Sequence, residues 1–134
     1  MVKLVFCIHR QPHLTREEFL RYWLDEHGRL ALALVDDLRV RRYVQLHTID
    51  TPLNDLFGAP RQAPEPFDGI VELWFDSLEV VEQMILTTEG RRAGKLLLDD
   101  ERTFIDLERS QIFFGEEHQL VPADGFPAVS TNRA

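Results

Sequence analysis

TREEFLRYWLDEHGRLALAL, residues 15–34, has the pattern of one amphipathic helix with a histidine in the middle of its apolar face. Thr15, with Glu18 three residues later, forms a capping box that begins such a helix. The apolar stripe recurs at intervals of three and four residues and consists of Leu20, Trp23, Leu24, His27, Leu30, Ala31 and Leu34. Because an imidazole titrates near neutral pH and responds to burial, this stretch provides one candidate functional site.

Four strands and a second helix are predicted around this stretch. Apolar or alternating segments predict strands at residues 2–9, 40–48, 67–75 and 110–118, the second of them an edge strand or a partly exposed one. Residues 78–98 predict a helix capped at Asp76 or Ser77 and kinked at Gly90, followed by a polar connection at 102–109. The order β-α-β-β-α-β predicts an α+β, ferredoxin-like fold with helices on one face of an antiparallel sheet.

The chain of 134 residues has the length of one domain, which we place at residues 1–119. Residues 120–134 form a C-terminal tail that we expect to be loosely ordered. The segment 50–66 holds four prolines, too many for a long helix or a ladder strand. We interpret this loop as a cover, as an arm that contacts a dimer partner, or as a mobile connection.

The composition argues against several partners. A formal net charge of −8 disfavours nucleic acid and anionic membrane surfaces, because both need a basic face. No segment has the roughly 18 consecutive apolar residues of a membrane span, and the start, MVKLVFCIHR, lacks the apolar length of a signal peptide. Cys7 is the single cysteine, so an internal disulfide is impossible, and we expect a cytoplasmic location.

Both faces of the predicted sheet carry apolar side chains. In the first strand, Val5 and Cys7 alternate with Leu4, Phe6 and Ile8. Helices cover one face, and an uncovered apolar face of this size marks an interface. We therefore predict a two-fold homodimer formed through the sheet face.

Five short motifs stand out along the chain: FCIHR at 6–10, LTREEF at 14–19, YWLDEH at 22–27, RYVQ at 42–45 and FID at 104–106. Together they resemble the EthD family of the dimeric α+β barrel superfamily, over residues 2–120. The resemblance implies a ferredoxin-like protomer whose sheet pairs with a second sheet to form a barrel. The family is named for a protein of ether-degradation operons, and similar proteins include fungal polyketide-pathway decarboxylases or dehydratases.

Methylmuconolactone isomerase looks like a relative with the same barrel, a helix histidine and a strand tyrosine. The resemblance implies that His27 and Tyr43 occupy these two positions. Isomerase-type sites also rely on cysteines, and this chain has only Cys7, on its first strand. We therefore do not expect the cysteine-dependent form of that chemistry.

Each candidate site residue has a functional and a structural interpretation. His27 is a general acid or base on a small substrate, a role worth roughly 10²–10⁴-fold in rate, or a core histidine bonded to a backbone carbonyl or to Tyr43. Tyr43 holds a substrate oxygen or orients His27, unless its hydroxyl simply lies at the surface. The candidate substrate-binding residues, each of which has core packing or a strand-end position as its alternative, are Phe19, Trp23, His47 and Trp74.

Motifs for metals and nucleotides are missing from the sequence. The histidines lack ligand spacing, and there is no Gly-rich phosphate loop, dinucleotide fingerprint or nucleophile elbow. The acidic runs at 36–37 and 99–101 are interpreted as solvated faces. We expect no metal and no cofactor, with haem as the alternative because other barrels of the superfamily bind it.

The leading hypothesis is a small cofactor-independent enzyme of catabolic or polyketide-type metabolism. It would act on a small carbonyl, lactone or aromatic compound as an isomerase, dehydratase, decarboxylase or oxidase, with His27 as its acid or base. The competing hypothesis is a non-catalytic ligand-binding or accessory protein for a degradation pathway. A His27 that lines a reachable cavity favours the enzyme, and a fully packed His27 favours its rival.

Overall fold

The computed structural model describes residues 1–122, so most of the predicted tail, 120–134, lies outside the described residues. Its strands are β1 (Val2–Ile8), β2 (Arg42–His47), β3 (Gly69–Phe75) and β4 (Gln111–Gly115). Its α-helices are α1 (Arg16–Tyr22), α2 (Gly28–Leu34), α3 (Leu53–Gly58), α4 (Leu78–Met84) and α5 (Thr88–Phe104). A π turn, Trp23–His27, joins α1 to α2, and short 3₁₀ turns lie at Ala59–Arg61 and Leu107–Arg109.

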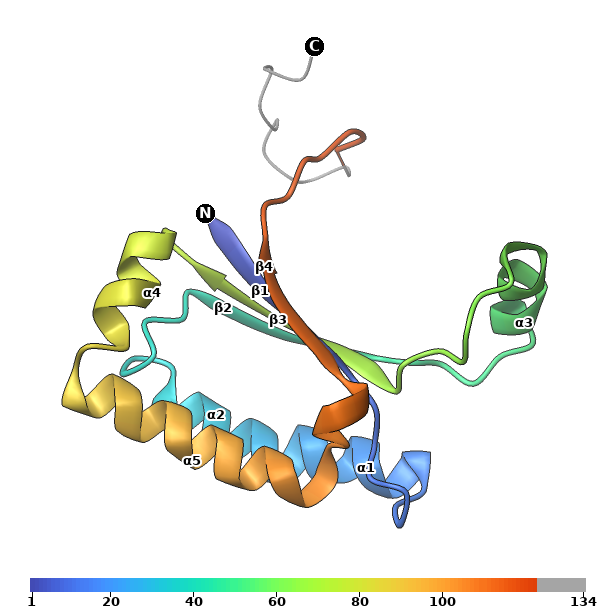
Figure 1. The fold of residues 1–134 in the computed structure, drawn as a ribbon, viewed down its shortest axis with the longest axis horizontal. Helices are drawn as coiled ribbons and strands as arrows, with labels where there is room; N and C mark the ends of the chain where they lie inside the picture. The colour runs from blue at the N-terminus through green and yellow to red at the C-terminus, as the bar shows by residue number, and fades with distance from the viewer. Residues whose placement is uncertain (123–134) are drawn as a thin grey trace.

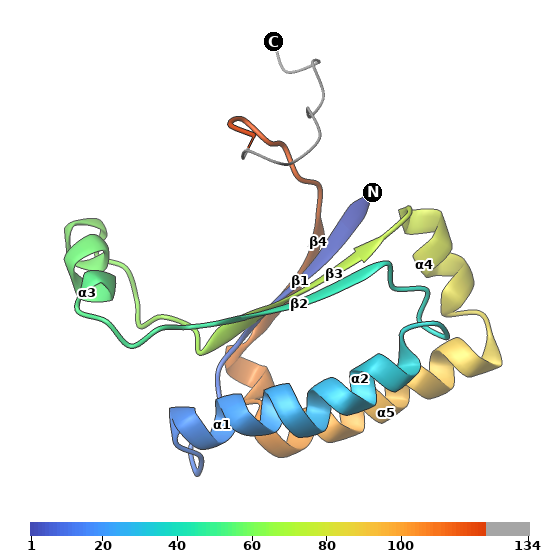
Figure 2. The same ribbon diagram turned by 180° about the vertical axis from the view of Figure 1, so that it is seen from behind.

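The strands form one antiparallel sheet in the order β2-β3-β1-β4, which confirms the ferredoxin-like prediction. β2 lies at an edge, as its half-polar sequence indicates. Helices α1, α2 and α5 lie along the same face of the sheet, and α4 leads into α5 at one end (Figures 1 and 2). None of the helices in residues 1–122 is long and apolar enough to cross a membrane.

The helix predicted at 15–34 forms as one rod interrupted by the π turn. Its capping box is present, with Thr15 and Glu18 each bonding the other's backbone N–H. In an α-helix, side chains four residues apart drift by roughly 40° around the axis at each step. The wider π turn offsets this drift, so Phe19, Trp23 and His27 all face the core. Leu24, predicted on the apolar stripe, is instead 58% exposed.

The helix predicted at 78–98 is in fact two helices, α4 and α5, and the sequence analysis placed no break between them. The Thr87 hydroxyl caps α5 by accepting a hydrogen bond from the Gly90 backbone N–H. The chain therefore breaks before Gly90, whereas the sequence predicted a kink at Gly90. A side chain at Gly90 would lie 2.1 Å from the Met84 carbonyl oxygen, which explains the glycine. α5 then continues to Phe104, which corrects the helix end predicted at residue 98 and shortens the predicted connection at 102–109. Phe104 and Ile105, the two apolar residues of that connection, are core residues at 1% exposure.

The Pro-rich loop contains a short helix of six residues, α3, which the sequence analysis did not identify and which agrees with the expectation that no long helix forms there. Proline is tolerated in the first turn of a helix, where its missing N–H has no partner, and Pro52 stands directly before α3. The loop projects away from the helical layer as an arm (Figure 1). Leu53, Leu56 and Phe57 are all more than half exposed on it. Within one protomer, therefore, the loop covers neither the sheet nor the helices.

Candidate functional site

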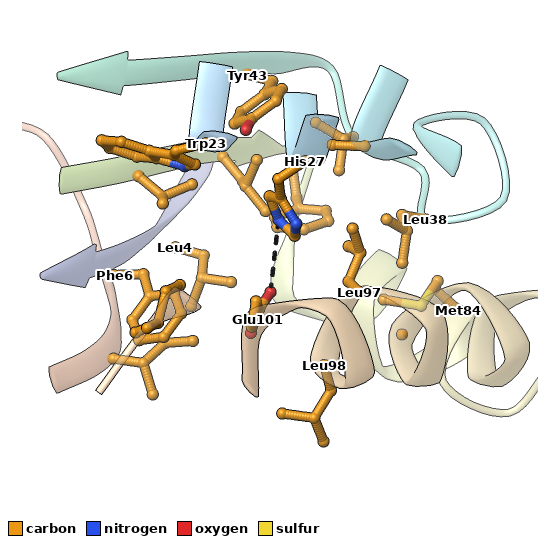
Figure 3. Close-up of a pocket in the computed structure, with 18 residues that line it drawn as sticks. Leu4, Phe6, Trp23, His27, Leu38, Tyr43, Met84, Leu97, Leu98 and Glu101 are labelled. Atoms are coloured by element: carbon orange, nitrogen blue, oxygen red, sulfur yellow. Dashed lines mark ion pairs between the residues drawn. The ribbon is translucent and has the colours of Figure 1, made fainter. Parts of the chain in front are cut away.

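A cavity of about 280 Å³ lies between the helix-covered face of the sheet and helices α2, α4 and α5 (Figure 3). Its walls come from all four strands and are almost wholly apolar. The titratable side chains that reach it are His27, Tyr43 and Glu101. An apolar pocket with a few convergent polar groups is the usual form of a small-molecule site, and this one is at the small end of the range.

His27 enters the cavity from the π turn and is 6% exposed. Its Nδ1 lies 2.7 Å from Oδ2 of Asp100, whose other oxygen accepts a hydrogen bond of 2.5 Å from the Tyr22 hydroxyl. A carboxylate only accepts hydrogen bonds, so Nδ1 carries the proton and Nε2 presents its lone pair. The ring is bonded neither to a backbone carbonyl nor to Tyr43, the two partners expected of a merely structural histidine.

Glu101 lies on the other side of the imidazole, with Oε2 3.9 Å from Nε2 of His27 (Figure 3). Burial, with a smaller contribution from the Asp100 charge, raises the pKa of Glu101 to about 7. Burial also lowers the pKa of His27, although Asp100 opposes this effect. Near neutral pH the cavity therefore holds a neutral imidazole beside a carboxyl group that is about half protonated.

Asp100 and Glu101 correct the interpretation of residues 99–101 as a solvated acidic face. Asp99 is exposed and pairs with Lys95, whereas its two neighbours turn toward His27. Helical spacing would have indicated this, because residues 93, 97, 101 and 104 recur every three or four positions and include the buried Ala93 and Phe104.

Tyr43 lines the cavity from β2, and Gln45 holds it. The Gln45 amide nitrogen donates to the Tyr43 hydroxyl oxygen at 2.7 Å and to the Trp23 carbonyl at 3.0 Å. That carbonyl also accepts from the Gly28 backbone N–H that closes the π turn. Burial raises the pKa of Tyr43, so the phenol stays protonated at neutral pH. Gln45 was quoted within the RYVQ motif but was not identified as a site residue.

Trp23 forms part of the cavity wall and is fully buried. Its ring stacks on His47 with a centroid distance of 4.7 Å and an interplanar angle of 19°. A side chain at Gly69 would lie 2.4 Å from the indole, so the glycine makes the space that the ring occupies. The Trp23 Nε1 atom has no hydrogen-bond partner within residues 1–122, which costs about 1–3 kcal/mol for a buried donor.

Three of the predicted substrate-binding residues do not line this cavity. Phe19 is fully buried behind Trp23 and packs against Phe104. His47 lies beyond the Trp23 ring, in a shallow groove outside the cavity. Trp74 faces the opposite side of the sheet, where its indole donates to Glu117 at 2.8 Å. Strand alternation separates the two faces, but it does not say which face the helices cover.

Within residues 1–122 no cluster of three or more His, Cys, Asp or Glu side chains is arranged to hold a metal ion. Burial raises the pKa of the Cys7 thiol, and the strand register places Cys7 beside Ile70, on the face away from the cavity. Cysteine chemistry therefore has no place in this cavity.

Comparison with solved structures shows the same fold in several proteins. An EthD-family protein from Bacillus halodurans C-125 is 22% identical, with a TM-score of 0.58 over 88% of this chain and 99% of its own. A dimeric ferredoxin-like protein of unknown function from Bacteroides fragilis is 15% identical, with a TM-score of 0.54 over 87% and 95%. SnoaB, a cofactor-independent oxygenase from Streptomyces nogalater, is 12% identical, with a TM-score of 0.53 over 91% and 97%.

A comparison with curated proteins finds no match. The EthD domain family, in contrast, matches residues 11–108, which include the π turn, β2 and the acidic end of α5. The sequence match spans most of the chain, and the solved structures show the same fold over nearly its whole length. The chain therefore belongs to the EthD family.

Proposed function

We propose that this protein is a cofactor-independent enzyme that moves a proton on a small, largely apolar carbonyl, lactone or aromatic compound. The observation that carries the proposal is the arrangement of His27. Its Nδ1 is held by Asp100 at 2.7 Å, and its Nε2 faces an apolar cavity beside Glu101. A neutral imidazole in fixed orientation is a general base, and the neighbouring carboxyl group, whose pKa is about 7, is a general acid in its protonated form.

The chemistry follows from these two groups. His27 Nε2 takes a proton from the carbon next to a carbonyl, and the C–H electron pair forms a carbon–carbon double bond as the carbonyl π pair moves to oxygen. Glu101 supplies a proton to the oxygen or to another carbon, after which His27 returns its own proton to the carboxylate. Isomerisation, dehydration and cofactor-free oxidation begin with this proton removal, and decarboxylation ends with the reverse step.

The fold relatives support the proposal at a coarser level. SnoaB is described as an oxygenase that needs no cofactor, and it has the same fold. We place this protein, on that analogy, among small enzymes of catabolic or polyketide-type metabolism. The competing hypothesis, a non-catalytic binding or accessory protein, predicts the same cavity without proton transfer.

Hydrogen–deuterium exchange of a simple ketone separates the two hypotheses. In D₂O, the wild-type protein should speed exchange of the α-protons of 1-indanone, followed by proton NMR. His27→Gln should remove about 10²–10³-fold of this acceleration, whereas His118→Gln, at an exposed histidine, should leave it unchanged. If 1-indanone binds but exchanges at the uncatalysed rate, the binding-protein hypothesis replaces the enzyme.

We also propose a homodimer through the outer face of the sheet. No helix of the described residues covers this face, and Leu46 and Phe113 on it are 56% and 51% exposed. The Bacteroides fragilis protein of the same fold is described as dimeric. Sedimentation equilibrium should give twice the chain mass for the wild type and for Glu108→Gln, and a single chain mass for Phe113→Asp. A monomeric wild-type protein would contradict this assembly.

A further inference from the structure

Gly94 lies in the interior of α5 and lines the cavity. Glycine inside a helix lowers the folding equilibrium about two- to fivefold relative to alanine, because its backbone loses more freedom on folding. At Gly69 and Gly90 an added β-carbon would collide with neighbouring atoms, so the packing requires glycine there. At Gly94 it would lie more than 4 Å from every atom of another element within residues 1–122. Neither packing nor helical geometry therefore explains this glycine.

The cavity opens to solvent on the side where Gly94 lies. Among its lining residues, the exposed ones are Gly94, Leu98 and Ile112, whereas each of the others is buried or partly buried. Leu98 is 39% exposed, and Ile112 is 57% exposed. Gly94 and Leu98 belong to α5 and Ile112 belongs to β4, so the mouth of the cavity lies between these two elements.

The face of α5 that borders the cavity leads from this mouth to the acid–base pair. Gly94, Leu98 and Glu101 recur at intervals of four and three residues, so they share one face of the helix. At a rise of about 1.5 Å per residue, Gly94 and Glu101 are about 10 Å apart along the axis. Figure 3 shows Glu101 directed at His27 and Leu98 directed away from it. A compound placed between His27 and Glu101 can therefore extend along α5 and leave the cavity past Gly94.

We propose that Gly94 keeps this mouth open, and that the site takes elongated, neutral, apolar compounds with a carbonyl group at the enclosed end. On the function proposed above, on which this assignment rests, the reacting end lies beside His27 and Glu101. A cavity of about 280 Å³ is at the small end of ligand sites, so a longer compound must extend outside it. No Lys or Arg of the described residues lines the cavity, so a charged compound would lack a counter-charge.

Two ketones of different length test this assignment. The probes are 1-indanone and 5-phenyl-1-indanone, which share the reacting end, and the second carries an additional ring at the end opposite the carbonyl. Isothermal titration calorimetry measures both dissociation constants for the wild type, Gly94→Ala and Gly94→Leu. Arg92→Leu is the matched control, because it adds the same side chain to an exposed position of the same helix that does not line the cavity.

The wild type and Arg92→Leu should bind the longer ketone about tenfold more tightly, because its additional ring buries apolar surface at the mouth. Gly94→Leu fills that space and should lower the ratio of the two affinities by about tenfold or more. Gly94→Ala should lower the ratio by about threefold or less. Urea unfolding should show Gly94→Ala to be more stable than the wild type, with a folding equilibrium raised about two- to fivefold.

The exchange of the α-protons of both ketones in D₂O separates this assignment from the proposed function. If 1-indanone exchanges and Gly94→Leu keeps the wild-type affinity ratio, Gly94 does not control the mouth, and the function stands. An equal loss of affinity for both ketones would likewise contradict a role in selecting length. If both ketones bind without faster exchange, the enzyme hypothesis fails, and the affinity ratio still decides the role of Gly94. If neither ketone binds the wild type, both proposals are overturned.

Discussion

Asp68 and Glu101 are two carboxyl groups that the fold withdraws from water, with opposite consequences. Asp68, 2% exposed, accepts from the Arg10 backbone N–H at 2.8 Å and from Arg16 Nε at 2.9 Å, and it also pairs with the Arg10 guanidinium. Burial raises the pKa of Asp68, but these hydrogen bonds and the Arg10 charge outweigh it and lower the pKa overall. Among residues 1–122, no arginine or lysine pairs with Glu101 in this way, and the pKa of Glu101 rises to about 7.

Both acids are buried, so burial alone does not separate a structural acid from a reactive one. The difference is whether hydrogen bonds and positive charges offset the cost of burying the carboxylate. Asp68 keeps its charge at neutral pH and ties the β1 end to the start of α1. Glu101 changes its charge near neutral pH, inside a cavity and beside a histidine. Strongly shifted pKa values in a cleft are typical of functional sites, which supports the site proposed here.

Asp68→Asn should have the largest effect. The substitution leaves two arginines without their anion, and breaking such a buried pair costs about 3–5 kcal/mol. Urea unfolding at neutral pH measures the loss. The exposed Asp76→Asn, whose carboxylate lies 3.8 Å from Arg41, should change stability by less than about 0.5 kcal/mol. Equal stability of Asp68→Asn and the wild type would show that the arginines do not depend on Asp68.

Glu101→Gln should stabilise the protein above neutral pH. The pKa of Glu101 is higher in the folded state than its ordinary value of 4.5. The folded state therefore binds more protons, and wild-type stability falls as the pH rises from about 4.5 to about 7. The variant lacks this loss, so it should gain up to about 3 kcal/mol near pH 8 and much less near pH 5.

Urea unfolding at both pH values checks the gain from Glu101→Gln. The matched control is Glu108→Gln, at an exposed position, whose stability should not depend on pH in this way. A gain of the same size at both pH values would mean that Glu101 does not titrate in this window. The comparison with Asp68 would then lose its basis.

Asp100→Asn should reduce the proton-transfer activity by about 100-fold. Asn has one acceptor oxygen where Asp has two, so it cannot accept from the Tyr22 hydroxyl and the His27 Nδ1 proton through separate oxygens. If its NH₂ faces Nδ1, the opposite imidazole tautomer is favoured and the Nε2 lone pair is lost. Because Asp100 opposes the lowering of the His27 pKa, the substitution should lower that pKa further. The exchange rate of 1-indanone and the NMR titration of His27 measure both effects. Asp99→Asn, next in the sequence but exposed, should change neither.

Tyr22→Phe should have the smallest effect. It removes the hydroxyl that donates to Asp100 at 2.5 Å and leaves the His27 contact in place. One hydrogen bond of this kind contributes about 1 kcal/mol, so the exchange rate should fall about threefold to fivefold. A loss as large as that of Asp100→Asn would mean that Tyr22 takes part in the proton transfer itself.

Local sequence patterns predicted most of the fold. Capping residues, apolar periodicity and turn-forming residues each act over a few positions, so the order β-α-β-β-α-β could be read from the chain. The break at residues 85–87 was missed because the apolar periodicity continues through it and Gly90 indicated a kink instead. The short α3 was missed because its segment is rich in proline. The exposure of Leu24 was missed because a π turn has no reliable sequence signature.

The candidate site was only half predictable. His27 and Tyr43 came from a periodic stripe and a family resemblance, and both reach the cavity. Trp74 was assigned to the site because strand alternation does not show which face the helices will cover. Asp100 and Gln45 were not identified, because each acts on a residue of another element far along the chain.

The sequence by itself determined the fold, the helix that carries His27 and the apolar character of its surroundings, because each depends on residues close together in the chain. Only the tertiary structure decided that Asp100, 73 positions later, holds the imidazole, and that Glu101 loses the water that would keep it charged. The same packing left the Trp23 N–H without a partner. Reactivity here depends on what surrounds each polar group, and those surroundings form when distant elements pack together.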